Sequence, residues 1–462
     1  MLIFALITLI GLIIISLLSF RWALFFYLIT ALVFPVLKIG EFAIRIELIY
    51  SLWLIILFVT RSLVFKNQKV NFQWRPIILV YALFLTALLF STLLLLFTGG
   101  SSAISKQSLI PFYGFIRPLL IMLLFRNTQF TERWLNRLLT TFVVLSIPIS
   151  ILSICQTLGL DFAQDLTLRC YASPWRTSLP VVKSQYGYLL RSTGVFEYHG
   201  YNATFSLTVI LITGYLLIKE PVLNFNLRRK RNLALLYTSL VLSTIAGLFS
   251  VSVTFLLGVA VVLLLLALSS RTSPRGLLKF STIMAIVIGA ILIFVAPVIL
   301  KSSNLRQGLL NQIGRIIDGN FLKGRYYLPS AGILAPTYEA ITRRPLFGYG
   351  FGEGFFSGNS LYVGLLYRGG IIGLGLWFFF IATTLKFTYR HSGLITRLIF
   401  FLTILYLAIG LGNPAFFIPR LSEWYWALIG LSGSLMVGSF TEKHRQLRVL
   451  HIIPDLKKGG AE

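Results

Sequence analysis

The sequence predicts an all-α polytopic membrane protein with about thirteen transmembrane helices and two large external loops. Hydrophobic residues make up 57% of the 462 residues and charged residues only 12%, whereas soluble domains carry roughly 25% charged residues. Apolar runs of about 18 to 22 residues recur along the chain, and each can cross a hydrocarbon core of roughly 30 Å. Because a helix satisfies all its backbone groups within a single segment, each run predicts a transmembrane helix.

The predicted spans begin at the first residue. The run 1–19 lacks a basic start and an Ala-x-Ala cleavage site, so it predicts a retained helix and not a signal peptide. A large soluble core would need amphipathic periodicity, which the runs do not show. The expected spans are, in order, 1–19, 22–37, 46–62, 76–98, 108–125, 138–158, 202–218, 232–248, 252–269, 280–300, 370–386, 396–412 and 424–440.

The lysine and arginine residues of the short loops predict the orientation of these helices, because such loops are more basic on the cytoplasmic side. Placing all the basic clusters inside makes the helices alternate, with the N-terminus outside and the C-terminus in the cytoplasm. The clusters are 61–75, 126–137, 228–231, 271–279, 386–397 and 443–448. The chain then divides into helices 1–158, external loop 159–201, helices 202–300, external loop 301–369, helices 370–440 and a cytoplasmic tail 441–462.

The first external loop ends in a segment rich in chemically active residues, directly before a membrane helix. Arg191, Glu197 and His199 lie within nine residues of one another, together with two glycines and Asn202. Turn formation explains the glycines and the asparagine. It does not explain the arginine, the carboxylate and the imidazole, so this segment is a candidate site.

The second external loop contains Gly324-Arg325, then a predicted amphipathic helix that includes Tyr338, then Arg343-Arg344. Pro345 ends that helix, and the alternating glycines that follow require an irregular backbone closely approached by another group. The stretch 358–375 predicts a short outer helix that re-enters the membrane through small residues.

Basic residues exceed acidic ones in this second loop, and two interpretations remain open. The excess is typical of a surface that meets anionic lipid headgroups. It is also typical of a pocket for a phosphate-bearing ligand, since arginine binds two phosphate oxygens at once.

Few ionisable residues fall inside the predicted spans. Arg117 lies in the fifth span, where a charge indicates either function or a side chain that reaches the outer surface. Arg45 and Glu47 can pair with each other. Cys155 and Cys170 are too few for a disulfide framework and have no metal-ligand spacing around them.

In the order and spacing of these elements, the chain resembles the O-antigen polymerase and O-antigen ligase superfamily over residues 180 to 380. These are polytopic glycosyltransferases that use polyprenyl-diphosphate-linked sugars. Arg343 followed by ten residues and Gly354 is also similar to a pattern of the polymerases. The matching elements are Arg191–Phe196, Gly324-Arg325, Pro345–Gly350, and Asn359 with Gly370–Leu374.

The sequence departs from the family pattern at three places. Gly358 stands where family ligases commonly carry a histidine, which favours a polymerase over a ligase. His199 stands where relatives often have proline or a small residue. Ser250-Val-Ser252 stands in a helix hairpin where relatives often show Ser-Arg.

The resemblance implies a GT-C-like enzyme of the bacterial inner (plasma) membrane that joins lipid-linked repeat units. It implies polyprenyl-diphosphate-linked glycans as substrates, the lipid bilayer and other polysaccharide-assembly proteins as partners, and no nucleic acid. No cofactor is expected, and no metal, because cationic side chains can replace a divalent ion and no Asp-x-Asp element occurs. The expected catalytic residues are Arg191, Arg343, Glu197 and His199, and the expected substrate-binding residues are Arg325, Arg344, Arg117, Asn359 and Tyr338.

The last residues, 448–462, resemble the opening strand and glycine loop of a two-Rossmann-domain glycosyltransferase. Fifteen residues cannot form that domain. A longer fusion, overlap with a neighbouring reading frame, and chance similarity all remain open as explanations.

Three other functions remain as alternatives to a polymerase. A ligase would pass the glycan to another acceptor, and a non-catalytic partner of an export complex would tolerate loss of single loop arginines. A lipid-linked oligosaccharide transporter would be expected to show internal repeats and ionisable residues near the membrane midplane. The sequence shows no convincing repeat and few charges in its spans.

Overall fold

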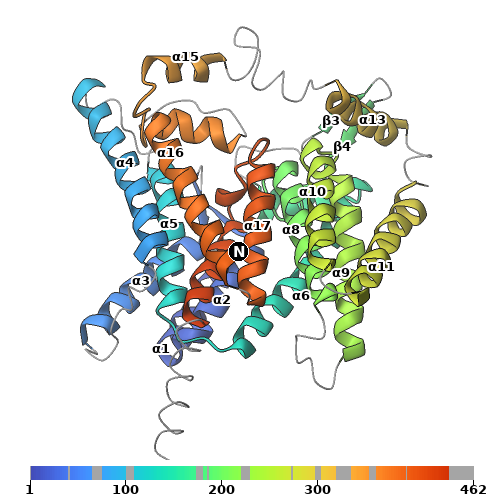
Figure 1. Ribbon diagram of the computed structural model, residues 1–462, viewed down its shortest axis with the longest axis horizontal. Helices are drawn as coiled ribbons and strands as arrows, with labels where there is room; N and C mark the ends of the chain where they lie inside the picture. Colours follow the sequence, from blue (N-terminus) through green and yellow to red (C-terminus); the bar gives the residue numbers. More distant parts are fainter. Residues whose placement is uncertain are drawn as a thin grey trace, which may run out of the picture.

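The computed structural model describes most of the chain, and helices dominate it (Figure 1). The only strands in the described part form two short antiparallel hairpins. The described residues are 2–39, 42–64, 75–99, 109–172, 181–184, 187–219, 229–271, 274–296, 303–318, 335–352, 360–391 and 393–435.

The N-terminal part contains six helices and one hairpin. Helix α6 begins six residues before the predicted span, because the polar stretch from Glu132 is compatible with helix and its acidic residue suits a helix N-terminus. The elements are α1 (Leu2–Leu18), α2 (Phe20–Val33), β1 (Val36–Ile39), β2 (Phe42–Arg45), α3 (Ile46–Val64), α4 (Arg75–Gly99), α5 (Leu109–Arg126) and α6 (Glu132–Thr157).

The middle part places a short helix and a hairpin before four apolar helices. These are α7 (Asp161–Cys170), β3 (Val181–Ser184), β4 (Gly187–Leu190), α8 (His199–Ile218), α9 (Arg229–Phe249), α10 (Val253–Ser270) and α11 (Pro274–Ala290), which continues as a π-turn, η4 (Ile291–Val295). The C-terminal part contains α13 (Ser303–Ile317), α15 (Ala335–Arg343), α16 (Leu361–Arg390), α17 (Leu394–Ile409), the 3₁₀ turn η6 (Ala415–Phe417) and a helix over 422–435.

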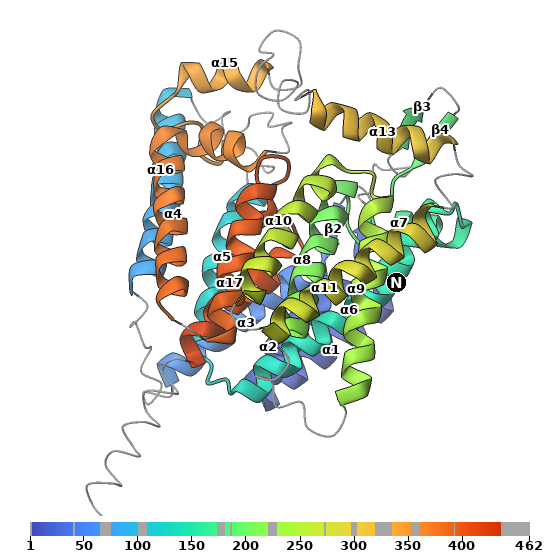
Figure 2. The same ribbon diagram turned by 45° about the vertical axis from the view of Figure 1, so that its right-hand side comes forward.

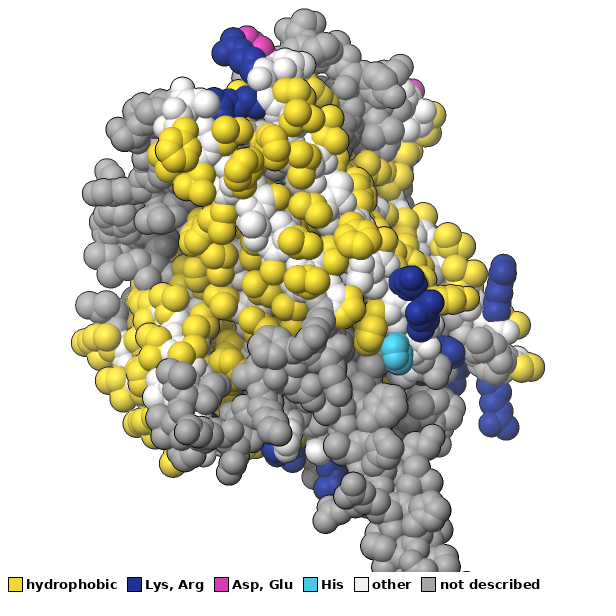
Figure 3. Space-filling view, turned by 60° about the vertical axis from the view of Figure 1, so that its left-hand side comes forward, with side chains coloured by type: hydrophobic (Ala, Val, Ile, Leu, Met, Phe, Trp, Pro, Cys, Tyr) yellow, Lys and Arg dark blue, Asp and Glu magenta, His cyan; other side chains and the backbone are white. Residues whose placement is uncertain are grey.

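Seven helices in the described part are long and apolar enough to cross a membrane, and three more apolar helices are shorter. Each predicted span overlaps a helix over most of its described residues. The span 22–37 was drawn too long: α2 ends at Val33, because Pro35 disfavours helical backbone in the residue before it, and the chain continues into strand β1. The face shown in Figure 3 is a broad hydrophobic band, with lysine and arginine side chains near its upper and lower margins. These observations confirm an all-α, multi-pass membrane protein.

Helix α8 lies at the centre of one half of the molecule and packs against α9, α10 and α6. It is almost wholly buried. Close approach depends on small residues: a Cβ on Gly258 of α10 would lie 2.2 Å from the Leu207 side chain. Paired serines join α6 to α9, with 2.6 Å between the hydroxyls of Ser146 and Ser239. Such small and hydroxylated contacts are typical of helices packed within a bilayer.

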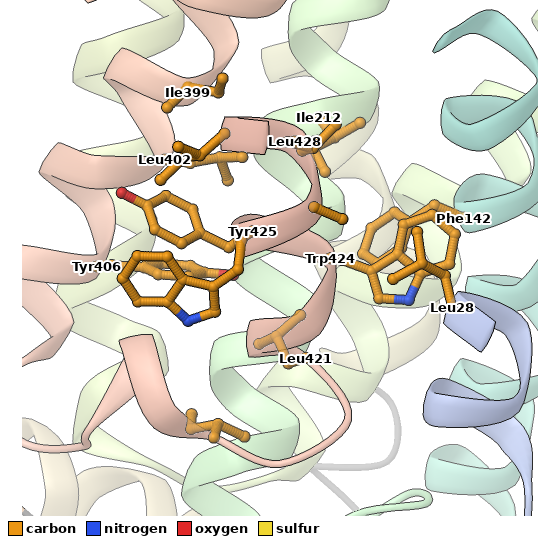
Figure 4. Close-up of a cluster of buried hydrophobic side chains, with 14 of the residues drawn as sticks. Leu28, Phe142, Ile212, Ile399, Leu402, Tyr406, Leu421, Trp424, Tyr425 and Leu428 are labelled. Carbon is orange, nitrogen blue, oxygen red and sulfur yellow. The ribbon is translucent and has the colours of Figure 1, made fainter. Parts of the chain in front are cut away.

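The helix over 422–435 lies within the helix bundle, where its side chains pack against α17 and α6 (Figure 4). Tyr425 packs on Tyr406 of α17 with ring centroids 5.2 Å apart. Trp424 packs on Phe142 of α6 with ring centroids 4.9 Å apart. The C-terminal helix therefore links α17 to α6 through buried aromatic rings, which contribute beyond simple burial.

Both predicted external loops contain regular structure, and it lies at one end of the molecule (Figures 1 and 2). Helix α7 and the β3–β4 hairpin occupy part of 159–201, and α13 occupies the start of 301–369. None of these three elements was expected from the sequence, because short polar segments lack the apolar length that reveals a membrane span. It did expect the helix through Tyr338, which is α15.

Helix α16 bends sharply at Gly370, which separates an outer helix from a longer one that returns through the helix layer. Gly370 has φ 59° and ψ −162°, a backbone conformation open almost only to glycine. A Cβ at this position would lie 2.2 Å from the Leu346 carbonyl oxygen. The outer helix and its return were both expected from the sequence.

The glycine-rich turn after α15 is closely approached, as its sequence predicts, but by the chain itself. A Cβ on Gly350 would lie 2.2 Å from Thr92 Oγ1 of α4, and one on Gly348 would lie 2.5 Å from the Tyr367 carbonyl oxygen of α16. The Tyr349 amide donates to that same oxygen at 2.9 Å. These glycines therefore join α4 to the bend of α16.

Candidate functional site

A cavity of about 400 Å³ opens between α10, α13, the end of α17 and the segment that precedes α8. Its lining combines cationic and polar side chains with an aliphatic wall. The polar members are Arg191, His199, Ser252, Thr254, Gln312 and Arg315, and the apolar members include Val251, Val253, Leu257, Ala260, Val261, Ala408, Ile409 and Leu411.

The apolar wall extends from the loop end of the molecule into the helix layer. Helix α10 starts at Val253, beside the polar group, and Leu257 and Val261 follow one and two turns further along the same helix. At about 1.5 Å per residue, Val261 lies roughly 12 Å deeper than Val253. The cavity therefore offers cations at its outer end and hydrocarbon contacts further in.

Arg191 and His199 meet at the polar end of the cavity. Arg191 Nη1 lies 2.7 Å from His199 Nε2. Burial, together with the smaller effect of the neighbouring Arg315, lowers the pKa of Arg191 to about 10. Arg191 nevertheless stays charged at neutral pH. None of the described residues that line the cavity is a carboxylate, so these two arginines face it without a lining anion.

The turn that carries Arg191 is held from below by α6. Gln156 is fully buried, and its Oε1 accepts hydrogen bonds from the Thr193 and Gly194 amides, each at 2.9 Å. Its Nε2 donates to the Gly194 carbonyl oxygen at 3.1 Å and also to Thr167. Gly194 has φ 58°, which suits glycine in a turn.

Two asparagines complete the support of this segment. Asn202 of α8 donates from Nδ2 to Ser192 Oγ at 3.0 Å and accepts at Oδ1 from Ser153 of α6 at 3.1 Å. Asn413, beyond α17, donates to the Gly200 carbonyl oxygen at 3.2 Å and to Thr254 Oγ1 at 3.0 Å. Buried amides with satisfied partners hold a backbone rigidly, so the positions of Arg191 and His199 are well defined.

The arginines expected from the second loop lie elsewhere. Arg343 is on an exposed face of α15, and its guanidinium pairs with Glu339 at 2.6 Å; the two side chains are 71% and 66% exposed. Arg344 donates to Thr98 of α4 at 2.5 Å. Tyr338 packs beside the small cluster of Ile341, Val363 and Tyr367. Neither arginine nor this tyrosine lines the cavity, and Arg325 and Asn359 lie outside the described residues.

Glu197 is half-buried and does not line the cavity, although it is only two residues before His199. Closeness to His199 in the sequence therefore does not bring the Glu197 side chain into the cavity. Of the two residues expected as bases, His199 is the one that faces the cavity.

Arg117 does not reach the outer surface. It is 5% exposed, and its Nη1 lies 2.8 Å from Glu423 of the C-terminal helix. Arg45 pairs with Glu47 as expected and also approaches Glu423, at 3.7 Å. Arg420 donates to the Phe34 carbonyl oxygen at 2.7 Å close by. Buried charges are thus more numerous than the sequence indicated, since Glu423 and Arg420 were overlooked.

Four polar members of the cavity were not expected from the sequence, namely Ser252, Thr254, Gln312 and Arg315. Arg315 and Gln312 lie on α13, one turn apart and on one face, and their spacing could have been noticed once a helix was assigned there. Ser252 lies in the α9–α10 hairpin that had been noted only as a departure from the family pattern. Among the described residues, no group of three His, Cys, Asp or Glu side chains could hold a metal ion.

A scan of protein-family models finds no match to this chain, and a search of curated proteins also finds none.

Proposed function

We propose that the protein is a membrane glycosyltransferase that polymerises polyprenyl-diphosphate-linked oligosaccharide repeat units into a surface polysaccharide. One observation carries this proposal: Arg191 and Arg315 face a cavity whose described lining has no carboxylate and whose far wall is aliphatic. A lipid diphosphate has the matching form, with a polyanionic head and a hydrocarbon chain.

The chemistry of such an enzyme fits these side chains. When the bond between the sugar and the diphosphate breaks, negative charge grows on the leaving diphosphate. The two arginines that line the cavity would stabilise that charge, because each donates several hydrogen bonds and keeps its charge at neutral pH. Removing one such preorganised donor typically costs about 3 kcal/mol of transition-state stabilisation.

The topology is part of the proposal. We infer thirteen spans in a bacterial plasma membrane, with the N-terminus and both long loops outside and the C-terminus in the cytoplasm. The common location of α13, α15 and the β3–β4 hairpin at one end of the molecule supports this arrangement. Lipid-linked glycan would then meet the cavity at the outer leaflet.

The resemblance to the O-antigen polymerase and ligase superfamily also supports the proposal, and one departure has a structural counterpart. Relatives often carry an arginine where Val251 and Ser252 form the α9–α10 hairpin. Both residues line the cavity here, and Arg315 of α13 enters the same cavity. We infer that Arg315 supplies the second cation that the hairpin lacks.

Polymer synthesis from lipid-diphosphate-linked repeat units in nanodiscs would test the proposal. Wild type would be compared with Arg191→Ala and Arg315→Ala, in the presence of a chelator, and Arg343→Ala serves as a matched exposed control. We expect a glycan ladder from wild type and Arg343→Ala, and at least a hundredfold less from the two cavity variants, which is about 3 kcal/mol. Folded wild type that makes no ladder from authentic substrate would refute the polymerase.

A ligase would be recognised in the same assay by transfer of one glycan to a different acceptor without chain growth. The buried charges around Arg117 and Glu423 favour a second candidate, a lipid-linked oligosaccharide transporter, because ionisable groups inside a membrane protein often line a transport path. A transporter would move labelled lipid-linked glycan across a vesicle membrane and would make no polymer.

A further inference from the structure

The contact between Arg191 and His199 determines which imidazole nitrogen carries the proton. A guanidinium group has only donors. At 2.7 Å from Arg191 Nη1, His199 Nε2 must therefore be the acceptor. The imidazole is consequently neutral, with its proton on Nδ1, and the lone pair of Nε2 is occupied by the arginine.

The surroundings of His199 also oppose a positive charge on the ring. Arg315 reaches the same cavity from α13, and Arg191 reaches it from the segment before α8. His199 is the first residue of α8, where the helix dipole is positive and disfavours a cation. Glu197 is the one carboxylate on its own segment, and it does not line the cavity. The lining residues of α10 and of the chain after α17 are uncharged.

We propose that Arg191 holds His199 in an inactive neutral form, and that a bound diphosphate draws Arg191 away and releases Nε2 as the base for the incoming hydroxyl. This inference rests on the proposed function, since it requires a diphosphate in the cavity. It adds a regulatory step: the base becomes available only when the donor is present.

The release changes both partners of the contact. A diphosphate offers arginine charged oxygens, which form hydrogen bonds about twice as strong as a neutral imidazole does. The same anion then lies near His199 and favours its protonated form. Both changes act together, because losing Arg191 frees Nε2 and gaining the anion makes that nitrogen more basic.

The resulting step balances. The oxygen of the acceptor hydroxyl forms a bond to the anomeric carbon of the donor sugar. The bond from that carbon to the diphosphate oxygen breaks, and its electron pair moves to the diphosphate beside Arg191 and Arg315. The hydroxyl proton moves to His199 Nε2. Without a donor, Nε2 stays occupied, so the site does not activate water or an acceptor prematurely.

Nitrogen NMR of the full chain in nanodiscs tests this mechanism directly, because the sequence holds only four histidines. The protein would be labelled with ¹⁵N-histidine, and the His199 signals identified by their loss in His199→Gln. Geranylgeranyl diphosphate is the probe, and geranylgeraniol is the control that lacks the phosphates. Probe binding would be measured independently by calorimetry.

We expect His199 in the free protein to show the Nδ1–H tautomer. The diphosphate should raise the titration midpoint of His199 by about one unit or more relative to the free protein, and the alcohol should not. Arg191→Met should raise the midpoint without any ligand. If that variant does not fold, the comparison of free and bound wild type decides the matter alone.

Two results would overturn the mechanism. One is an Nε2–H tautomer in the free protein, which the contact with Arg191 excludes. The other is saturating diphosphate binding that leaves the His199 midpoint unchanged, and this would leave the proposed function intact. If the diphosphate does not bind at all, the diphosphate site of the proposed function fails, and the release step fails with it.

Discussion

Gln156 contacts both sides of the Gly194 peptide backbone. Its Oε1 accepts from the Gly194 amide at 2.9 Å, and its Nε2 donates to the Gly194 carbonyl oxygen at 3.1 Å. A single side chain thus satisfies a buried turn that has no sheet or helix to bond with. Because Arg191 precedes this turn and His199 follows it, the contact determines where both side chains enter the cavity.

Replacement of Gln156 by leucine should therefore impair activity and stability together. The change leaves the buried amides of Thr193 and Gly194 without their acceptor, at a cost of about 1–3 kcal/mol for each unsatisfied group. We expect a lower unfolding temperature in detergent and at least a tenfold loss of polymer synthesis. Gln164→Leu on α7, at a half-buried position outside this turn, is the matched control and should change neither.

The pairing of Arg117 on α5 with Glu423 on the helix over 422–435 predicts that substitutions at the two residues affect stability non-additively. Arg117→Met leaves Glu423 and Glu47 buried beside fewer cations, and breaking a buried pair in this way typically costs about 3–5 kcal/mol. Glu423→Gln should also destabilise. The double variant should lose less stability than the sum of the two, because it leaves neither charge alone. Additive losses in thermal unfolding would show that the two residues do not interact.

The sequence predicted the membrane helices well, because a long apolar run can satisfy its own backbone hydrogen bonds in a bilayer only as a helix. It also predicted the outer helix and the bend of α16, since the glycines at the bend have no other explanation there. Elements without such a signal were missed. Helix α13 is short and amphipathic, so its polar face, with Gln312 and Arg315, became visible only with its position over the cavity.

The candidate site was predictable only where its members are close in sequence. Arg191 and His199 lie eight residues apart, and the structure brings them into contact. Arg343 was expected beside them on the strength of family-like spacing, but α15 carries it to an exposed face where it pairs with Glu339. Glu423 was missed because nothing in the sequence near position 423 indicates that Arg117 is its partner. Contacts between distant segments depend on packing that a single sequence does not encode locally.

Gly350, in the turn between α15 and α16, gives a direct test of how closely this turn packs against α4. Gly350 has φ 57°, and an added Cβ would lie 2.2 Å from Thr92 Oγ1. Gly350→Ala should therefore destabilise the protein by about 1–3 kcal/mol through backbone strain and overpacking. Gly375→Ala is the matched control, because no atom lies within 4 Å of its added Cβ. Equal unfolding temperatures for the two variants would contradict the close contact.

The lowered pKa of Arg191 predicts an unusual pH dependence for diphosphate binding. Only the protonated guanidinium attracts the anion, and its pKa in the free protein is about 10, which is below the ordinary value of an arginine. The affinity for the diphosphate should therefore be constant below pH 9 and fall about tenfold per pH unit above pH 10. Calorimetry with geranylgeranyl diphosphate between pH 8 and pH 11 would measure this. Arg191→Met should bind more weakly throughout and lose this slope, and a wild-type affinity that stays constant to pH 11 would show that Arg191 is not the titrating group.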